Sequence, residues 1–215
     1  MLVRTLLLGA ALACGALAQQ QTRYIPRFAS SWNVSYIGGP SPYKLVRVNG
    51  ASGGLWYALT PRGSAPPTAS ALTGLVPAGE ALTHIATPLQ HAAFLSSTQI
   101  NWAELLGVRA SVAAVLGAPY ISSPCVLRMV SEGATQDVTA ADGYSADTAA
   151  LSGVQAVFCT SGWCPGTPSD VVFPDTQETS LLGIAETGAW GVWWGGWAGG
   201  EVCGADVCVC QKASL

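Results

Sequence analysis

Apolar and polar residues alternate along the first part of the chain. Residues 32–36, 43–48 and 55–59 are short runs of this kind, and a Gly-Gly-Pro sequence separates the first two runs. Alternation with a period of two residues is typical of a strand with one buried face, and a Gly-Pro cluster is typical of a turn. The pattern therefore predicts several strands within a β-rich lead-in that covers residues 24–85.

Further along, the apolar residues form continuous runs in place of the alternation. Residues 91–96, 111–116 and 154–159 are short apolar segments, each bounded by polar residues or glycine. Runs of this length without alternation are typical of strands that are buried on both faces. We therefore expect three buried strands in the second half of the chain.

Helical spacing of apolar residues separates these buried runs. One helix is predicted from Thr98, as its N-cap, to Gly107, and another from Pro124 to Gly133, with a further short helix over residues 147–153. Strands that alternate with helices are typical of an α/β domain with a largely parallel sheet.

Composition narrows the classes of function. Only 10% of the residues are charged, and nine Lys+Arg against twelve Asp+Glu give a formal net charge of -3. So low a charged fraction argues against a disordered chain. A nucleic-acid binder needs a basic patch to neutralise phosphates, and the acidic balance argues against one, as it does against a polybasic membrane patch.

The first residues have the pattern of a secretory signal. Arg4 precedes an apolar run over residues 6–12, and Ala16-Leu17-Ala18 has the small-x-small form of a cleavage site. We therefore expect residues 1–18 to be a signal peptide, and the mature chain to be extracellular, at the cell surface or in a periplasm-like space. Asn33 begins an Asn-Val-Ser sequon, which predicts glycosylation; an unused tripeptide is the alternative.

The cysteines fit an exported protein. Of the seven, Cys14 lies in the signal, which leaves six. Cys159 and Cys164 flank a short turn and could form a local disulfide in an oxidising compartment. A zinc site is less favoured, because the three remaining C-terminal cysteines lack paired C-x-x-C spacing and have no histidine near them.

Two predicted loops join a strand to a helix, where α/β sheets bind ligands. Ser96, Ser97 and Thr98 offer hydroxyls and backbone N–H groups for anionic or carbonyl groups. In the second loop, Tyr120 offers a flat amphipathic face and Ser122 a hydroxyl. The alternative is plain helix capping by Thr98 and Ser122, with Tyr120 packed on the core.

The order of these segments resembles the solute-binding proteins of ABC importers that carry iron–siderophores, haem and cobalamin. The resemblance covers roughly residues 28–186 and is carried by five pieces: the lead-in runs 32–36, 43–48 and 57–63; Phe94-Leu95-Ser96-Ser97-Thr98 with residues 102–108; Tyr120-Ile121-Ser122-Ser123-Pro124 with Gly133; residues 145–158; and residues 177–186. The fourth piece departs from the family pattern at residues 153–156.

The family has two α/β lobes that close on a ligand. The resemblance implies that residues 86–187 are one Rossmann-like N-terminal lobe behind the β-rich lead-in, with the second lobe missing. It implies a non-catalytic protein that binds a corrinoid (cobalamin) or an iron chelate for uptake, with a membrane transporter as a partner and no resident cofactor, metal or nucleic acid.

Carried over residue by residue, the resemblance implies which side chains contact this ligand. They are Ser96, Ser97, Thr98, Tyr120, Ile121 and Ser122, with Trp163 as a further candidate. Glu132 corresponds to a lobe-tip carboxylate that contacts the transporter; its alternative is a solvated helix end.

The last part of the chain, residues 188–215, has a different composition. It holds 7 Gly, 4 Ala, 4 Trp, 4 Val and 3 Cys, where the family continues into a bridging helix. Seven glycines oppose a helix, at about 1 kcal/mol each relative to alanine. Because all these residue types have codons rich in G or T, one hypothesis is translated intron or frameshifted sequence. The rival is a secreted surface- or wall-associated protein whose Trp-rich tail binds glycan or membrane.

One enzymatic reading depends on residues 162–166. They match G-x-C-x-G, a cysteine version of the nucleophile elbow. Such a hydrolase needs a helix directly after the nucleophile and a later His, but Pro165 opens a loop and no His follows His91. We therefore expect no catalysis by Cys164.

Metal chemistry has equally weak support in the sequence. His84 and His91 lie on no common helix face, and Asp137, Asp142 and Asp147 lack the alternate spacing of an EF-hand. The three aspartates are typical of a solvated loop.

Overall fold

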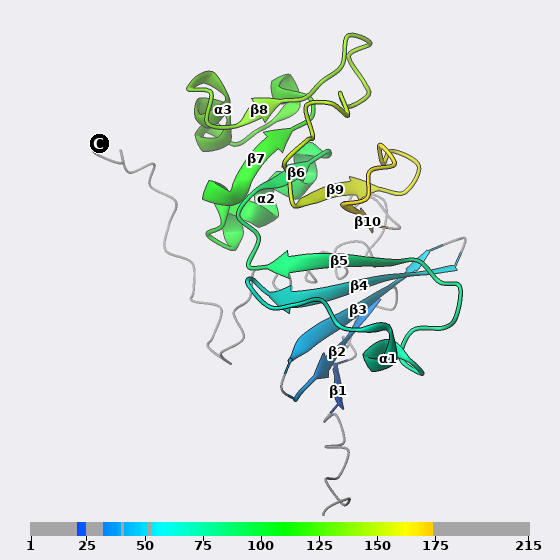
Figure 1. Cartoon of the computed structure of the whole chain (residues 1–215). Helices are drawn as coiled ribbons and strands as arrows, with labels where there is room; N and C mark the ends of the chain where they lie inside the picture. Colours follow the sequence, from blue (N-terminus) through cyan, green and yellow to red (C-terminus); the bar gives the residue numbers. More distant parts are fainter. Residues whose placement is uncertain (1–20, 25–31, 40, 51–52, 174–215) are drawn as a thin grey trace, which may run out of the picture.

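The computed structural model describes residues 21–24, 32–39, 41–50 and 53–173 (Figure 1). The predictions for residues 1–18, 177–186 and 188–215 lie outside the described residues. Among the described residues, no helix combines the length and the apolar character that a membrane crossing requires.

The lead-in forms a five-stranded sheet in the order β1-β2-β3-β4-β5. Neighbouring strands in this sheet pair antiparallel, except β4 and β5. These two are parallel, because the chain between them crosses over through helix α1, Ala69–Leu72. The strands are β1 Gln21–Tyr24, β2 Trp32–Ile37, β3 Tyr43–Gly50, β4 Gly53–Pro61 and β5 Leu82–Thr87. Strands β2, β3 and β4 confirm the alternating runs in the sequence.

The second half forms a five-stranded parallel sheet in the order β10-β9-β6-β7-β8. Its strands are β6 Ala92–Phe94, β7 Val112–Val115, β8 Gln136–Asp137, β9 Ala156–Thr160 and β10 Asp170–Phe173. The helices between them are α2 Ser97–Leu105, η1 Arg109–Ser111, η2 Ala118–Tyr120 and α3 Pro124–Ser131. The described part is thus a mixed α/β structure with one parallel sheet, as the pattern predicts.

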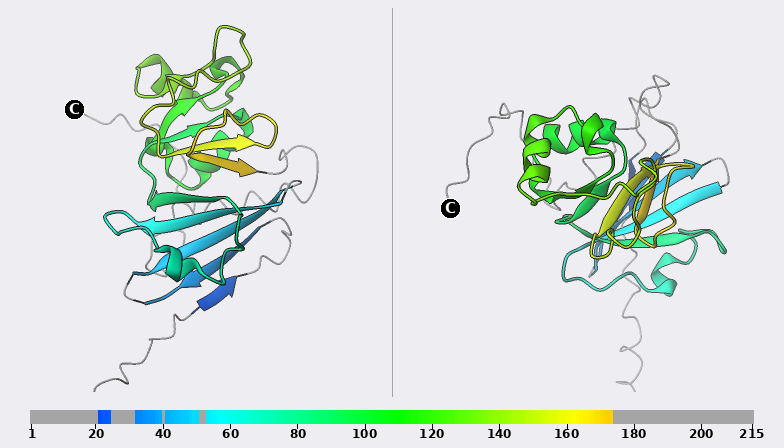
Figure 2. Two further views of the ribbon diagram at one scale, coloured as in Figure 1. Left: turned by 45° about the vertical axis from the view of Figure 1, so that its right-hand side comes forward. Right: turned by 90° about the horizontal axis from the view of Figure 1, so that it is seen from above.

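The two sheets share one hydrophobic core. Phe94 and Phe158 of the parallel sheet stack with ring centroids 5.2 Å apart, and they belong to the same buried cluster as Val46 and Leu59 of the antiparallel sheet. Figures 1 and 2 show the parallel sheet standing above the antiparallel one. The boundary expected from the sequence, between residues 85 and 86, falls inside β5, and the two sheets share this core.

The other face of the parallel sheet is covered by the segment between β8 and β9. Val138 and Leu151 of this segment pack with Ala93, Val157 and Cys159 of the sheet. This coverage buries both faces of β6 and β9, which explains why their sequences are continuously apolar.

The helix predicted over residues 147–153 is wrong, because the structure has a series of turns there. The backbone N–H groups of Ala150 and Leu151 donate to the carbonyls three residues before them, Asp147 and Thr148, at 3.1 and 3.3 Å. The Asp147 carboxylate also accepts from the Ala149 N–H at 3.0 Å. A side chain that bonds its own backbone in this way favours a turn over a helix.

The N-cap residues of the two helices lie one or two positions from the predicted ones. Ser96, not Thr98, is the N-cap of α2, and its side chain makes no capping bond. Ser123, not Ser122, caps α3: its hydroxyl accepts from the Val126 N–H at 3.1 Å. The predicted Pro124 at the first turn of α3 is confirmed.

Asn33, the residue of the sequon, is nearly buried in this fold. It lies in β2 opposite Arg47 of β3, and only 8% of it is exposed. Glycosylation of Asn33 therefore stays a prediction from the sequon.

Candidate ligand-binding site

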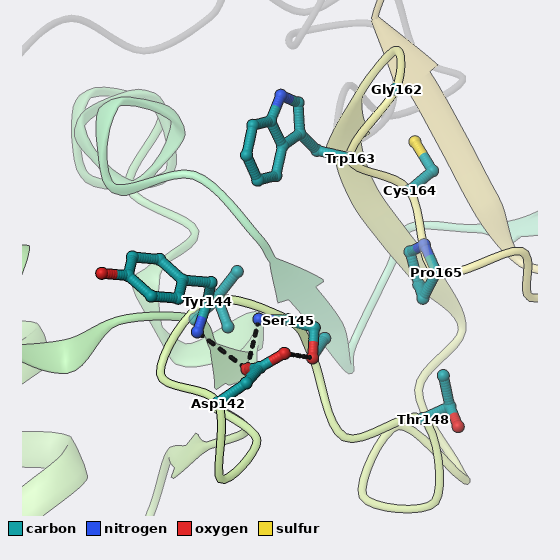
Figure 3. A pocket seen from close by; sticks show the side chains of 10 residues that line it. Asp142, Tyr144, Ser145, Thr148, Gly162, Trp163, Cys164 and Pro165 are labelled. Carbon is teal, nitrogen blue, oxygen red and sulfur yellow. Dashed lines mark hydrogen bonds between the residues drawn. The ribbon is translucent and has the colours of Figure 1, made fainter.

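A pocket lies at the carboxyl edge of the parallel sheet. Its volume is about 480 Å³, and it lies between the chain that leaves β7 and the chain that leaves β9 (Figure 3). The residues that line it are Leu116, Asp142, Tyr144, Ser145, Ala146, Thr148, Gly162, Trp163, Cys164 and Pro165. This position agrees with the general rule for ligand sites in parallel sheets.

Two large aromatic side chains of the pocket remain exposed. Tyr144 is 75% exposed and Trp163 is 71% exposed. They come from different loops and extend to the same side in Figure 3. Exposed rings that flank a hollow are typical of binding surfaces, because a ligand can cover them.

Asp142 shapes the loop that carries Tyr144. Its Oδ1 accepts from the backbone N–H groups of Tyr144 and Ser145, each at 2.9 Å, and its Oδ2 accepts from the Ser145 hydroxyl at 2.7 Å. The Ser145 hydroxyl, followed by the two backbone N–H groups, lowers the pKa of Asp142 from 3.8 to about 2. The carboxylate is therefore ionised at neutral pH and fixes the loop.

A disulfide fixes the loop that carries Trp163. Cys159, fully buried at the end of β9, is bonded to Cys164, with the two Cα atoms 5.2 Å apart. Within this loop the Trp163 N–H donates to the Thr160 carbonyl at 2.9 Å. The pair is the one that the sequence predicted, and it anchors the pocket wall to the core of the sheet.

Among the described residues, the group that could hold a metal ion is Cys159, Cys164 and Asp170. In the structure the two sulfurs are bonded to each other, so neither is a thiolate. Asp170 already accepts from the N–H groups of Gly166 and Thr167 at 2.9 and 3.1 Å, and also from the Thr167 hydroxyl. This arrangement caps a turn and offers no open set of zinc ligands.

Of the seven predicted ligand contacts, Trp163 lines the pocket and the other six do not. Ser96, Ser97 and Thr98 are half-buried at the start of α2, where the Ser96 and Thr98 hydroxyls are bonded to each other at 2.8 Å. Tyr120 is 76% exposed after β7, and Ser122 is exposed.

Ile121 has a different environment from its neighbours. It is 4% exposed and belongs to the core cluster that the two sheets share. Its side chain therefore has a packing role in the structure, in place of the ligand contact that the resemblance implies.

Tyr144, Ser145 and Thr148 line the pocket but were not predicted from the sequence. The sequence pattern assigns Asp142 to a solvated loop, whereas in the structure the Asp142 carboxylate holds a turn together. An Asp-Gly pair is typical of a turn in which the aspartate carboxylate accepts from the N–H groups two and three residues later. That signal could have placed Tyr144 at a loop tip.

Glu132 and His84 have local partners. Glu132 forms an ion pair with Arg128 on α3, at 2.6 Å. His84 Nε2 lies 2.8 Å from the Thr60 hydroxyl in the antiparallel sheet, and burial lowers the pKa of His84. Neither histidine lines the pocket.

Cys164 is not available as a nucleophile in this structure. Its sulfur is bonded to Cys159, and a loop, not a helix, follows it. The sulfur would have to be reduced before it could attack a substrate.

No known family model, curated protein or solved structure matches this chain. The chemistry of the pocket is therefore the basis for a proposed function.

Proposed function

We propose that the protein is a non-catalytic binding protein that holds a flat, amphipathic small molecule in the pocket at the carboxyl edge of the parallel sheet. The observation that carries this proposal is the pair of exposed rings, Tyr144 and Trp163, that flank one hollow. Hydroxyls of Ser145 and Thr148 lie in the same lining. An apolar face with a few polar groups is the composition that small-molecule sites share.

The resemblance to solute-binding proteins supplies the first ligands to test, a corrinoid such as cobalamin and a ferric chelate. Both have a broad apolar face and a polar rim, which suits two rings and two hydroxyls. A pocket of about 480 Å³ covers only part of a molecule of that size. One face of the ligand then stays in water, so we expect a Kd no tighter than about 1 µM, or about -8 kcal/mol.

Titration of the full chain with cyanocobalamin and with a ferric trihydroxamate tests the proposal. Ligand absorbance and tryptophan fluorescence are followed together, since Trp163 lies in the pocket. Saturable quenching that Trp163→Phe reduces is the expected result. If cyanocobalamin, the ferric trihydroxamate and a pair of ferric porphyrins all leave the fluorescence unchanged at millimolar concentration, the proposal is wrong.

Leu105→Ala is the matched control for this titration. Leu105 is 66% exposed on α2 and does not line the pocket, so its loss removes exposed apolar surface elsewhere. The variant should bind like the wild type.

The second hypothesis from the sequence, glycan or membrane binding by a Trp-rich tail, concerns residues outside the described part of the chain.

A further inference from the structure

The pocket has a charge of one sign. Asp142 is the one charged side chain among the described residues that line it. The pKa of Asp142 is about 2, so the carboxylate carries its charge at any physiological pH. The Tyr144 and Trp163 rings add to the same field, because the face of an aromatic ring is electronegative.

The sequence around the pocket continues this bias. No Lys, Arg or His occurs between Arg128 and Phe173, and this segment supplies every residue of the lining except Leu116. An anionic ligand would therefore find no positive side chain from the segment that builds the pocket.

The Asp142 carboxylate also keeps capacity for a ligand. Its three hydrogen bonds come from Tyr144 N, Ser145 N and Ser145 Oγ. The carboxylate keeps its negative charge while it accepts these bonds, so its exposed side remains a site for a cation. Since Asp142 is exposed at the pocket wall, a cationic group can approach that site without first displacing the turn.

We propose that the pocket selects a ring-bearing cation, held between Tyr144 and Trp163 and paired with Asp142, over an anion of the same shape. The ligand class is a flat organic cation or a cationic metal chelate. This proposal depends on the proposed function, because it names the charge of the ligand that the same site would take. Two rings attract a cation over their faces, and the carboxylate provides the opposite charge.

A matched pair of probes separates charge from shape. Two ferric porphyrins share one macrocycle and carry either four N-methylpyridinium groups or four sulfonatophenyl groups. We expect the full chain to bind the cationic porphyrin about tenfold more tightly than the anionic one, from one carboxylate and two ring faces. Asp142→Asn should remove most of this ratio, whereas Asp142→Glu should keep it.

Glu132→Gln is the control for net charge. It removes one negative charge from the exposed C-cap residue of α3, which does not line the pocket. The ratio should therefore stay at its wild-type value. Circular dichroism of each variant verifies that the fold is retained, and the Asp142→Glu variant gives a readout even if Asp142→Asn loosens the turn.

The outcomes distinguish this inference from the proposed function. Equal binding of the two porphyrins, tighter binding of the anionic one, or an unchanged ratio in Asp142→Asn overturns the charge selection but leaves a binding pocket. Failure of both porphyrins and of the first two ligands to bind overturns the proposed function as well.

Discussion

Asp142 links the shape of the candidate site to its charge. Its carboxylate holds the turn that carries the exposed Tyr144, and Asp142 is itself one of the residues that line the pocket (Figure 3). The two roles of Asp142 can be tested separately, because the turn depends on its hydrogen bonds and the choice of ligand depends on its charge.

Two tyrosines provide a matched test of where the ligand binds. Tyr144 and Tyr120 are 75% and 76% exposed, but only Tyr144 lines the pocket. Tyr144→Ala should weaken binding of the best ligand about tenfold, the upper range for the loss of one stacking ring. Tyr120→Ala should have no measurable effect in the same titration. The reverse result would place the ligand at the loop that the resemblance implies.

The pKa of Asp142 gives a second prediction. Because the folded-state pKa, about 2, lies below the ordinary 3.8, its hydrogen bonds stabilise the turn above about pH 4. That contribution is lost as the pH falls from about 4 to about 2. Ser145→Ala removes the largest cause and should raise the pKa in a carboxyl-carbon NMR titration. Thr148→Ala removes a pocket hydroxyl that does not donate to Asp142 and should leave the pKa unchanged.

At this scale the sequence predicted the Cys159–Cys164 pair, because the two cysteines flank a short turn at the end of a buried strand. Trp163 lies in the same turn and lines the pocket, and its contact with a ligand stays a prediction. The sequence could not identify Tyr144, because the loop that holds it reaches the pocket only through the folding of residues 138–154 over the sheet. Ile121 was misjudged because an apolar residue in a loop gives no sign of which side it faces.

The helices and turns follow from local capping more than from apolar spacing. Ser123 is 5% exposed, accepts from Val126 N, and donates to Glu104 Oε1 at 2.7 Å, so it ties the start of α3 to α2.

Strands β2, β3, β4, β6, β7 and β9 were predicted from apolar runs. Strands β1, β5, β8 and β10 were missed, because their short segments show neither clean alternation nor a long apolar run.

Ser123→Ala should lower the free energy of unfolding by about 1–2 kcal/mol, the usual range for a lost N-cap. Ser122→Ala changes the neighbouring exposed serine, which caps no helix, and should lower it by less than about 0.5 kcal/mol. Urea denaturation followed by circular dichroism measures both. Equal effects would show that the cap of α3 is assigned to the wrong residue.

At the scale of the whole molecule, the antiparallel and parallel sheets share one hydrophobic core, so we expect them to unfold together. The backbone N–H of Val172 in β10 donates to the Tyr57 hydroxyl of β4 at 2.9 Å, across the shared core. Burial raises the pKa of Tyr57 to about 12, so the hydroxyl stays protonated at neutral pH. The sequence could not show this union, because it depends on contacts between residues more than a hundred positions apart.

Tyr57→Phe should therefore destabilise the whole chain in a single transition, by about 1 kcal/mol, since the Val172 N–H loses its acceptor. Tyr120→Phe removes an exposed hydroxyl and is the control. Denaturation is followed by tryptophan fluorescence and by far-ultraviolet circular dichroism. Two separate transitions would show that the sheets fold independently.

The central claim is that the ligand binds at the carboxyl-edge pocket between Tyr144 and Trp163. The most direct measurement is an NMR titration of the ¹⁵N-labelled full chain with the tightest ligand found. We expect shifts concentrated at the amides of Tyr144, Ser145 and Gly162 and at the Trp163 indole N–H. Shifts concentrated instead at Ser96 to Thr98 and Tyr120, with the pocket signals unmoved, would contradict it.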